Sequence, residues 1–391
     1  MSTPFPTFHF TDEYTSHFPV IQRFFYELPW VDVRDYPSAT SPLFHLLFAI
    51  TAKVVGLNLQ ALRLVNIVVS LLAVVVFYSL VRCYTKNNEA LCLTLLFGLS
   101  PYFFGASFLV LTDNLGILFA LLALRSFHQS LERPGAGYWT SLCFWICMAT
   151  LTRQLYAWLA VGAALALIVR REPLRTAALK VTGLLLACLP LGILIAIWGG
   201  LTPPTFQHDH VATSLITPRS GVFGLSVFGL YWLALFPDGF VDCVRRLREQ
   251  RYLPLVGILF FTVVIFLAIP TAPQHDDDGI LWRLSRVTPE LAGTPIGFWL
   301  LAPVGLLFFW NTARSRDRLS AGTMCMALAF LICNLPNAKI FEKYYDPMII
   351  AFLIFIEARF QQSFKLSRIS RPLLMLAFGF YPVVSWRYFG H

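Results

Sequence analysis

The feature that most constrains this chain is a series of about twelve apolar segments separated by short polar connections. A bilayer core of roughly 30 Å needs about 20 apolar residues per helix, so this series predicts a protein that crosses a membrane repeatedly. The composition agrees, since 57% of the residues are hydrophobic and 13% are charged. Soluble domains carry about 25% charged residues. We therefore predict an all-α, polytopic membrane protein.

The predicted spans are assigned from the apolar segments, several of which are nearer to roughly 15 residues and favour short, tilted or shielded helices. They cover residues 61–82, 90–108, 114–128, 139–152, 155–169, 181–198, 221–236, 253–270, 296–311, 320–333, 344–358 and 372–386. Residues 43–57 are apolar but short, and they contain His45 and Lys53. We interpret them as an amphipathic helix at the membrane interface, with a re-entrant segment as the alternative. Residues 1–60 then form a lumenal loop, and residues 61–391 form the transmembrane domain.

Basic residues gather on one set of loops if the spans alternate in direction. That set holds 19 of the 30 Lys and Arg residues, whereas the opposite set holds 13 of the 21 Asp and Glu residues. The positive-inside rule makes the first set cytoplasmic. The second set faces a lumen or the cell exterior, and it contains the polar motifs described next. The net charge of +9 follows mostly from this loop bias and indicates lipid head groups rather than nucleic acid.

Two adjacent carboxylates, Asp12 and Glu13, precede a helix-like run near the N-terminus. One interpretation is a helix start, in which Thr11 or Asp12 caps the first turn. The other is a general base at the membrane surface, which would deprotonate an acceptor hydroxyl. No signal peptide is recognisable, and Asp12 precedes every predicted span. Either a short tail crosses the membrane bare or a further helix comes first; we expect the further helix.

Two more motifs lie at the tips of predicted helical hairpins. Thr112 and Asp113 open a span, where they either cap the helix or contact a substrate. Arg153 and Gln154 lie between two short spans, and a guanidinium there suits bidentate binding of a phosphate or carboxylate. The alternative for Arg153 is a side chain that snorkels to the membrane interface.

Other clusters on the same predicted face are less specific. His208 and His210 flank an aspartate, but their spacing favours sugar binding or a plain loop over a metal site. The run His275–Asp278 lacks the closing glutamate of a calcium loop, so we expect a solvated acidic loop. The eight cysteines occur singly, which predicts neither a disulfide framework nor a zinc ribbon.

A dense motif opens a late span, where Glu342, Lys343 and Tyr344 follow one another. Lys343 suits a phosphate charge, and Tyr344 with Tyr345 suits the lining of a sugar or lipid entrance. The alternative is an aromatic belt with its flanking lysine at the membrane surface.

These motifs, in this order, resemble the dolichyl-phosphate-glucose α-1,2-glucosyltransferases, which belong to the GT-C class of polytopic, lipid-donor glycosyltransferases. The Asp-Glu pair followed by His17 is similar to the D-E-x-F-H-x-P-Q motif of that family, with one extra residue before the histidine. The other similar segments are Tyr36–Leu43, Leu62–Asn66, Thr112–Asp113, Thr152–Gln154, His210–Ala212 and Phe341–Tyr345.

The resemblance implies a GT-C fold of about twelve transmembrane helices with lumenal amphipathic helices. It implies inverting transfer of a hexose, glucose in α-1,2 linkage, from dolichyl phosphate to a lipid-linked oligosaccharide in assembly of the N-glycan precursor. This would occur at the lumenal face of the endoplasmic reticulum membrane. The partners would be the donor, the acceptor and membrane lipids, with no nucleic acid.

The same resemblance implies roles for individual residues. Asp12 would be the base, supported by Glu13, while Arg153 and Lys343 would hold the donor phosphate. The residues that would shape the substrate pocket are His17, Thr112, Asp113, Gln154, His208, His210, Glu342 and Tyr344. No cofactor is expected, and no metal is required because fixed cations can offset the charge of the leaving phosphate.

Three alternatives remain open. The first is a GT-C mannosyltransferase that uses dolichyl- or polyprenyl-phosphate-mannose. The second is a transporter or flippase, which would need charges deep within its spans. Glu357, near the end of its span, is the candidate carboxylate for that function, and we expect it to be interfacial. The third is a degenerate, non-catalytic paralogue.

Overall fold

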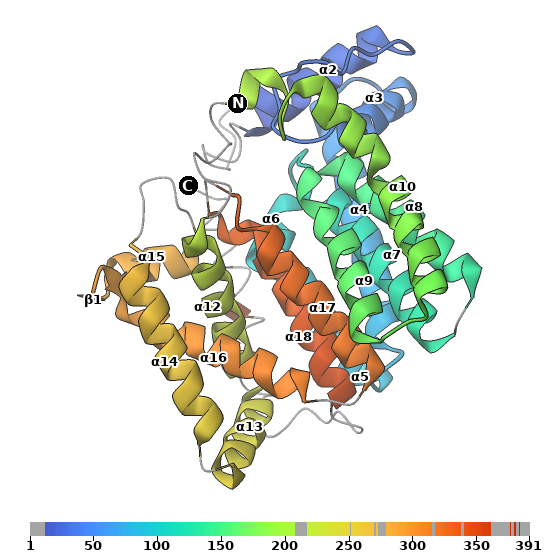
Figure 1. Cartoon of the computed structure of the whole chain (residues 1–391). Helices are drawn as coiled ribbons and strands as arrows, with labels where there is room; N and C mark the ends of the chain where they lie inside the picture. Colours follow the sequence, from blue (N-terminus) through green and yellow to red (C-terminus); the bar gives the residue numbers. More distant parts are fainter. Residues whose placement is uncertain are drawn as a thin grey trace. The chain divides into compact units, whose positions relative to one another are not determined.

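The structure is a computed structural model, and it describes residues 12–133, 135–207, 217–250, 252–269, 271–272, 279–314, 317–337 and 340–360, with residues 376, 379, 380 and 383. Most of these residues are helical (Figure 1). Two short strands, β1 (Glu290–Leu291) and β2 (Thr294–Pro295), pair antiparallel. The chain divides into two compact units: residues 1–80, 94–211 and 379–391 form the first, and residues 81–93 and 212–378 the second. The predicted division at residue 60 stays a prediction.

The first unit contains the N-terminal helices and two helical hairpins. A π-helical turn comes first and is followed by α-helices and short 3₁₀ turns. In chain order they are η1 (Glu13–His17), α2 (Phe18–Glu27), α3 (Leu43–Val55), α4 (Leu59–Val81), α6 (Pro101–Ala106), α7 (Asp113–Glu132), α8 (Ala136–Thr152), η2 (Gln154–Ala157), α9 (Trp158–Val169), α10 (Leu174–Trp198) and η3 (Pro204–Phe206). Helix α5 (Asn87–Gly98) has residues in both units.

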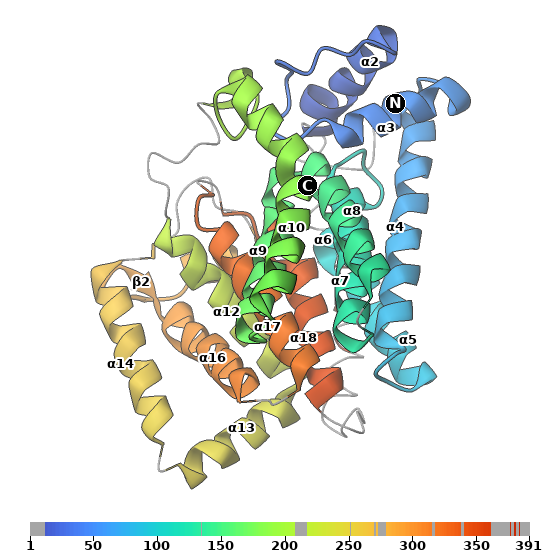
Figure 2. The ribbon, with the colours of Figure 1, turned by 45° about the vertical axis from the view of Figure 1, so that its right-hand side comes forward.

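The helices of the first unit have two distinct ends. Figures 1 and 2 show α2 and α3 at one end of α7, α8 and α10, and the α7–α8 and α9–α10 connections at the other. Helix α3 buries Phe44, Phe48 and Ala52, and it packs against α2. The expected helix near residues 43–57 is therefore confirmed, while its place at the membrane interface stays a prediction.

Two predicted spans of this unit differ from the observed helices. The single span predicted over 90–108 is wrong, because α5 ends at Gly98 and α6 begins at Pro101. Proline lacks an N–H and disfavours helical backbone in the residue before it, so it is favoured in the first turn of a helix and often marks a boundary, as it does at Pro101. Helix α10 begins at Leu174, whereas the predicted span begins at residue 181. The first turns were missed because Arg175 and Lys180 are charged and so lie outside the apolar segment.

The second unit is formed by the later helices. They are α12 (Pro218–Leu235), α13 (Pro237–Glu249), α14 (Leu253–Ala268), α15 (Ile280–Arg286), α16 (Ile296–Ala313), α17 (Arg318–Cys333), the 3₁₀ turn η4 (Glu342–Tyr344) and α18 (Asp346–Phe360). Helices α12 and α16 touch at two glycines: a Cβ on Gly229 would lie 2.1 Å from the Leu301 carbonyl oxygen, and a Cβ on Gly305 2.1 Å from that of Leu225. Small residues of this kind let membrane helices approach closely.

Helix α13 replaces part of a predicted loop. Arg245, Arg246 and Arg248 are predicted to lie in a cytoplasmic loop, yet they belong to a helix that buries Gly239, Cys243 and Leu247. These buried residues are four positions apart, so they form one apolar stripe along the helix, and the arginines lie on its other sides. It follows α12 at an angle of 105°.

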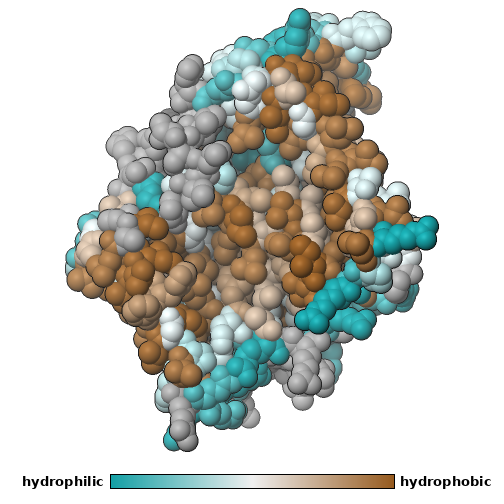
Figure 3. Space-filling model, viewed as in Figure 1, coloured by the Kyte–Doolittle hydropathy of each residue, from teal (hydrophilic) through white to brown (hydrophobic). Residues whose placement is uncertain are grey.

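Three of the described helices, α4, α10 and α16, are long and apolar enough to cross a membrane, and α12 with α13 gives a fourth if the bent pair is one span. Shorter apolar helices cover Leu43–Val55, Gln154–Val169, Leu253–Leu267 and Arg318–Cys333. Exposed aliphatic side chains such as Leu64 and Leu186 are typical of a lipid-facing surface. Apolar residues cover much of the face in Figure 3. The helical membrane fold is thus confirmed, and the number of twelve crossings stays a prediction.

Candidate active site

The predicted pair of carboxylates begins the first described helix. Asp12 is half-buried, whereas Glu13 has no exposed surface. Arg63 of α4 binds Glu13 through two bonds, from Nε to Oε1 at 3.1 Å and from Nη2 to Oε2 at 2.5 Å. The backbone N–H of Val110 also donates to Glu13 Oε1 at 2.7 Å. A bidentate guanidinium and a peptide amide hold a buried carboxylate in one orientation, so Glu13 fixes the backbone that presents Asp12.

The Val110 amide is positioned by a second side chain of α4. Asn66 Nδ2 donates to the carbonyl oxygens of Ala106 at 2.9 Å and of Leu109 at 2.6 Å. Asn66 lies three residues after Arg63, so both project from the same face of the helix. Helix α4 therefore holds both sides of the Glu13–Val110 hydrogen bond. Arg63 binds Glu13, and Asn66 binds the loop that carries Val110.

Asp113 and Arg153 form an ion pair between the two predicted hairpin tips. Arg153 Nη1 donates to Asp113 Oδ1 at 2.5 Å, and each side chain is 14% exposed. Asp113 is the first residue of α7, three residues after Val110, and Arg153 lies between α8 and η2. The arginine is thus held by a carboxylate rather than extended alone to the interface. The carboxylates of Asp12, Glu13 and Asp113 all belong to segments that meet at the loop 107–112.

The side chains offered as helix caps do not act as caps. Neither Asp12 before η1 nor Thr112 before α7 makes a side-chain cap hydrogen bond, so capping is wrong for these two side chains. Thr112 is buried. The next residue, Asn114, donates to Ser70 Oγ at 2.8 Å and to Ser107 Oγ at 3.0 Å, which ties α7 to α4 and to the loop.

Gln154 connects the site to two loops. Its Nε2 donates to the carbonyl oxygens of Ala39 at 3.0 Å and of Leu201 at 2.8 Å. Two residues later, the buried Tyr156 packs against Gly116 of α7, where a Cβ would lie 2.4 Å from the tyrosine ring. The absence of a side chain at Gly116 therefore lets η2 lie directly against the start of α7, one turn beyond the Asp113–Arg153 pair.

His17 pairs with the histidine of α3. His17 Nδ1 and His45 Nε2 are 3.1 Å apart, and the two rings are stacked with centroids 5.3 Å apart. Both rings are buried. Burial, and then the charge of His17, lower the pKa of His45 well below its ordinary value of 6.5. This pair attaches the end of η1, and with it the carboxylate pair, to α3.

The late motif, Glu342–Tyr344, belongs to the second unit. Glu342 is buried, and it accepts the backbone N–H of Leu281 at 2.7 Å. Lys343 Nζ lies 5.4 Å from the Phe341 ring centroid and 5.5 Å from that of Tyr344. Such distances indicate cation–π contacts. The substrate roles expected of Glu342, Lys343 and Tyr344 stay predictions.

Some predictions fall elsewhere. His208 and His210 lie outside the described residues, as does the run His275–Asp278. Glu357 is buried in the second unit and accepts the indole N–H of Trp232 at 2.7 Å, and its expected place at the membrane interface stays a prediction. Among the described residues, no three His, Cys, Asp or Glu side chains gather as metal ligands would.

Sequence reasoning missed how the first unit holds its carboxylates. Arg63 and Asn66 entered only as part of a family-like segment, and their partners Glu13, Ala106 and Leu109 were not anticipated. The available signal was an arginine and an asparagine three residues apart within an otherwise apolar stretch, since polar groups in membrane helices usually face protein.

Comparison with known proteins places this geometry in a wider context. Residues 37–198 match the family model described as dolichyl-phosphate-mannose-protein mannosyltransferase. This range includes Arg63, Asn66, Asp113 and Arg153. The comparison with curated proteins gives no match.

Two solved structures of one bacterial protein are similar to this chain. ArnT from Cupriavidus metallidurans bound to undecaprenyl phosphate has a TM-score of 0.53 at 15% identity, over 95% of this chain and 59% of the ArnT chain. Apo ArnT from the same organism has a TM-score of 0.43 at 14% identity, over 84% of this chain and 72% of the ArnT chain. This chain thus spans 59% of the lipid-bound ArnT structure. The chain is a multi-pass membrane protein with a fold similar to that of ArnT, and residues 37–198 match the family model of the dolichyl-phosphate-mannose-protein mannosyltransferases.

Proposed function

We propose that this chain is an inverting glycosyltransferase that transfers a hexose from a polyprenyl phosphate to an acceptor hydroxyl. One observation carries the proposal: Asp12 directly precedes a buried carboxylate that is fixed by Arg63 and by the Val110 amide. A carboxylate at such a rigid position is suited to act as a general base, because proton abstraction depends on geometry before acidity. The family match and the GT-C fold support the same reaction class.

In the proposed reaction, Asp12 accepts the proton of the acceptor hydroxyl. The hydroxyl oxygen attacks the anomeric carbon from the face opposite the phosphate, so a new C–O bond forms with inverted configuration. The bond from the anomeric carbon to the phosphate oxygen breaks, and its electron pair leaves with the polyprenyl phosphate. The protonated Asp12 then returns its proton to solvent.

Arg153 is the proposed partner of the leaving phosphate in the first unit. Its Nη1 is bound to Asp113, which holds the guanidinium plane in place. A guanidinium presents its N–H groups in a planar fork that suits phosphate oxygens. A fixed cation stabilises the charge that develops as the phosphate leaves. Lys343 is the proposed second cation.

We further propose glucose as the sugar, a lipid-linked oligosaccharide as the acceptor and the lumenal face of the endoplasmic reticulum as the place of reaction. The support is the sequence resemblance around Asp12 and His17. Mannose is the second candidate, because the matching family model is described by mannosyl transfer. The undecaprenyl phosphate named for the ArnT structure supports a polyprenyl phosphate donor in general.

The test is sugar transfer by the purified protein. It is supplied with dolichyl-phosphate-glucose or dolichyl-phosphate-mannose and with a lipid-linked oligosaccharide. Asp12→Asn is compared with Asp32→Asn, because Asp32 is a partly exposed aspartate bound to Arg34 and lies outside the site. Transfer of glucose that is lost only in Asp12→Asn supports the full proposal.

Other outcomes revise the proposal step by step. Transfer of mannose alone keeps the glycosyltransferase and rejects glucose. Transfer that survives in Asp12→Asn rejects Asp12 as the base. If neither sugar is transferred but the protein moves a lipid-linked sugar across vesicle membranes, the flippase alternative replaces the enzyme.

A further inference from the structure

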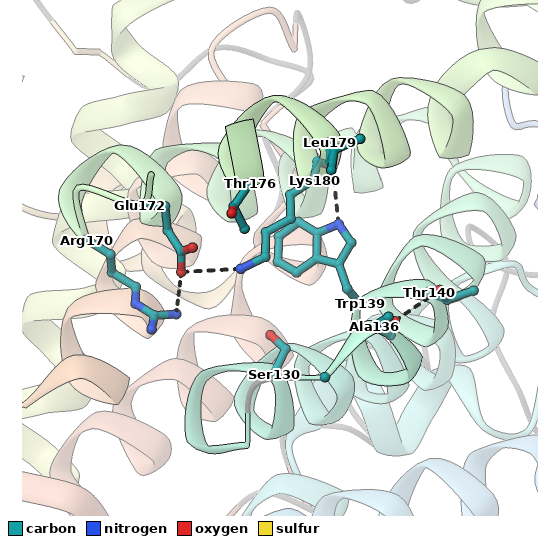
Figure 4. Close-up of a pocket in the computed structure, with 10 residues that line it drawn as sticks. Ser130, Ala136, Trp139, Thr140, Arg170, Glu172, Thr176, Leu179 and Lys180 are labelled. Carbon is teal, nitrogen blue, oxygen red and sulfur yellow. Dashed lines mark hydrogen bonds and ion pairs between the residues drawn. The ribbon is translucent and has the colours of Figure 1, made fainter. Parts of the chain in front are cut away.

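The end of the first unit away from α2 and α3 contains a pocket of about 500 Å³. Its walls come from the end of α7, the start of α8, the α9–α10 connection and the first turns of α10. The side chains that define its chemistry are Ser130, Trp139, Arg170, Glu172, Thr176 and Lys180 (Figure 4). None of them was assigned a function above. The charge distribution of the sequence predicts that this end is cytoplasmic.

The pocket has more positive than negative charge. Glu172 Oε1 lies 3.2 Å from Lys180 Nζ and 3.6 Å from Arg170 Nη1, so one carboxylate is shared by two cations. The three side chains are 14–24% exposed. An ion pair between each cation and the same Glu172 oxygen leaves N–H donors of the guanidinium and of the ammonium for another anion. The carboxylate sets the spacing of the cations, and a net positive charge remains.

Trp139 forms an oriented wall of the same pocket. Its indole N–H donates to the Lys180 carbonyl oxygen at 3.2 Å, and Lys180 Nζ lies 5.2 Å from the centroid of its ring. Figure 4 shows the indole between Lys180 and the α8 backbone, with Thr176 on α10 and Ser130 on α7. The pocket also includes Ala136, the first residue of α8, and Thr176 in the first turn of α10. Helix N-termini add partial positive charge where an anion would bind.

The surroundings of the pocket distinguish a lipid from a free anion. Two exposed leucines of α10 lie near the cations in the sequence: Leu174 is 86% exposed and Leu179 is 70% exposed. Ile168, at the end of α9, is 72% exposed. Leu179 also lines the pocket itself. Exposed leucine and isoleucine beside a basic pocket suit acyl chains, and basic pockets between membrane helices on the cytoplasmic side bind anionic head groups.

We propose that this pocket binds the phosphate head group of an anionic membrane lipid, with the acyl chains along Leu174 and Leu179. The phosphate lies between Arg170 and Lys180 and replaces part of the attraction that each now directs at Glu172. The site is at the opposite end of α8 and α10 from the Asp113–Arg153 pair, so it holds a structural or regulatory lipid. The inference does not rest on the proposed function.

The experiment is native mass spectrometry of the purified protein in detergent. The protein is titrated with phosphatidylglycerol, with phosphatidylcholine of the same acyl chains, and with inorganic phosphate. We expect one phosphatidylglycerol to be retained in preference to phosphatidylcholine. Loss of one charge-assisted hydrogen bond corresponds to roughly tenfold in affinity, so Arg170→Gln and Lys180→Gln should each weaken retention by about that factor.

The matched control is Arg175→Gln, which removes the same charge from an exposed position of α10 that does not line the pocket. Its effect should stay below about twofold, because salt screens exposed charges. Glu172→Gln should tighten phosphatidylglycerol binding, a result that misfolding would not give. Equal losses in Arg170→Gln and Arg175→Gln overturn the site. Equal binding of phosphatidylcholine, or displacement of the lipid by an equal concentration of inorganic phosphate, overturns the lipid assignment.

Discussion

The two ends of the first unit use ion pairs in different proportions. At the end with α2 and α3, Glu13 is matched with Arg63 and Asp113 with Arg153. At the other end, Glu172 is shared between Arg170 and Lys180. Matched pairs fix side chains and leave little net charge, whereas the shared carboxylate leaves a surplus of positive charge. The first arrangement suits a rigid catalytic frame, and the second suits an anionic ligand.

The largest expected effect concerns Asp12, the proposed base beside the Glu13–Arg63 pair. Asp12→Asn should lower sugar transfer by about 10²- to 10⁴-fold, because a positioned general base contributes a factor of that size. The measurement is initial rates with saturating donor. Asp32→Asn, at an aspartate paired with Arg34 outside both sites, is the matched control, and its transfer rate should remain near that of the unchanged protein. A similar loss in both variants would contradict the role of Asp12 as the base.

The next effect concerns stability at a matched pair. Arg63→Ala leaves Glu13 buried without its guanidinium, and removing one partner of a buried pair costs about 3–5 kcal/mol. We expect a large drop in thermal unfolding temperature in detergent. Arg34→Ala, which removes an exposed partner of Asp32, should leave that temperature nearly unchanged.

A double variant sharpens the result for Arg63. Glu13→Gln with Arg63→Met removes both charges at once, so it should recover part of the stability lost in Arg63→Ala. If the double variant is less stable than Arg63→Ala alone, the charge-pair explanation is wrong and packing accounts for the loss.

A smaller effect is expected at the second matched pair. Arg153→Gln removes one charge-assisted contact to the donor phosphate, which corresponds to about 10- to 100-fold in kcat/KM. Arg153→Lys keeps the charge but not the planar fork, so its loss should be smaller. Steady-state kinetics with varied donor concentration measure both variants. Equal kcat/KM for Arg153→Gln and the unchanged protein would exclude a phosphate contact.

The smallest effect is a pH dependence confined to the α2–α3 end. Because burial lowers the pKa of His45 below 6.5, the unfolded chain binds a proton more readily than the folded one as pH falls through 6.5. Stability from neutral His45 is present above pH 6.5 and is lost progressively below it. Thermal unfolding between pH 7.5 and 5.5 should show a falling midpoint, and His45→Gln should flatten that slope. An unchanged slope would reject this source of pH dependence.

Periodicity and charge predicted much of the helical framework and little of its internal bonding. The spans near α4, α7, α14 and α17 follow from apolar runs, which are local features of the sequence. The break at Pro101 was missed because the residues on both sides of the proline are apolar and look like one span. Helix α13 was missed because its arginines are more conspicuous than its apolar stripe.

The site was predicted as separate motifs rather than as contacts. Asp12, Asp113 and Arg153 stand out because charges are rare in apolar sequence. The contacts that hold the site together do not stand out in the same way. Glu13, for example, binds Arg63 and Val110, which lie 50 and 97 residues away along the chain. Such pairings depend on how helices pack, and one sequence contains no local signal for them. The roles of His208, His210 and Lys343 stay predictions.

Gly116 carries no charge, but the space beside it affects the distance between Arg153 and Asp113. Since the Tyr156 ring occupies the space of its missing side chain, a single added methyl group would push η2 away from α7. Arg153 precedes that turn and Asp113 precedes Gly116, so the displacement would lengthen the distance between them. Variation in the size of one small residue could thus tune how firmly the guanidinium is held, with every ionisable group left in place.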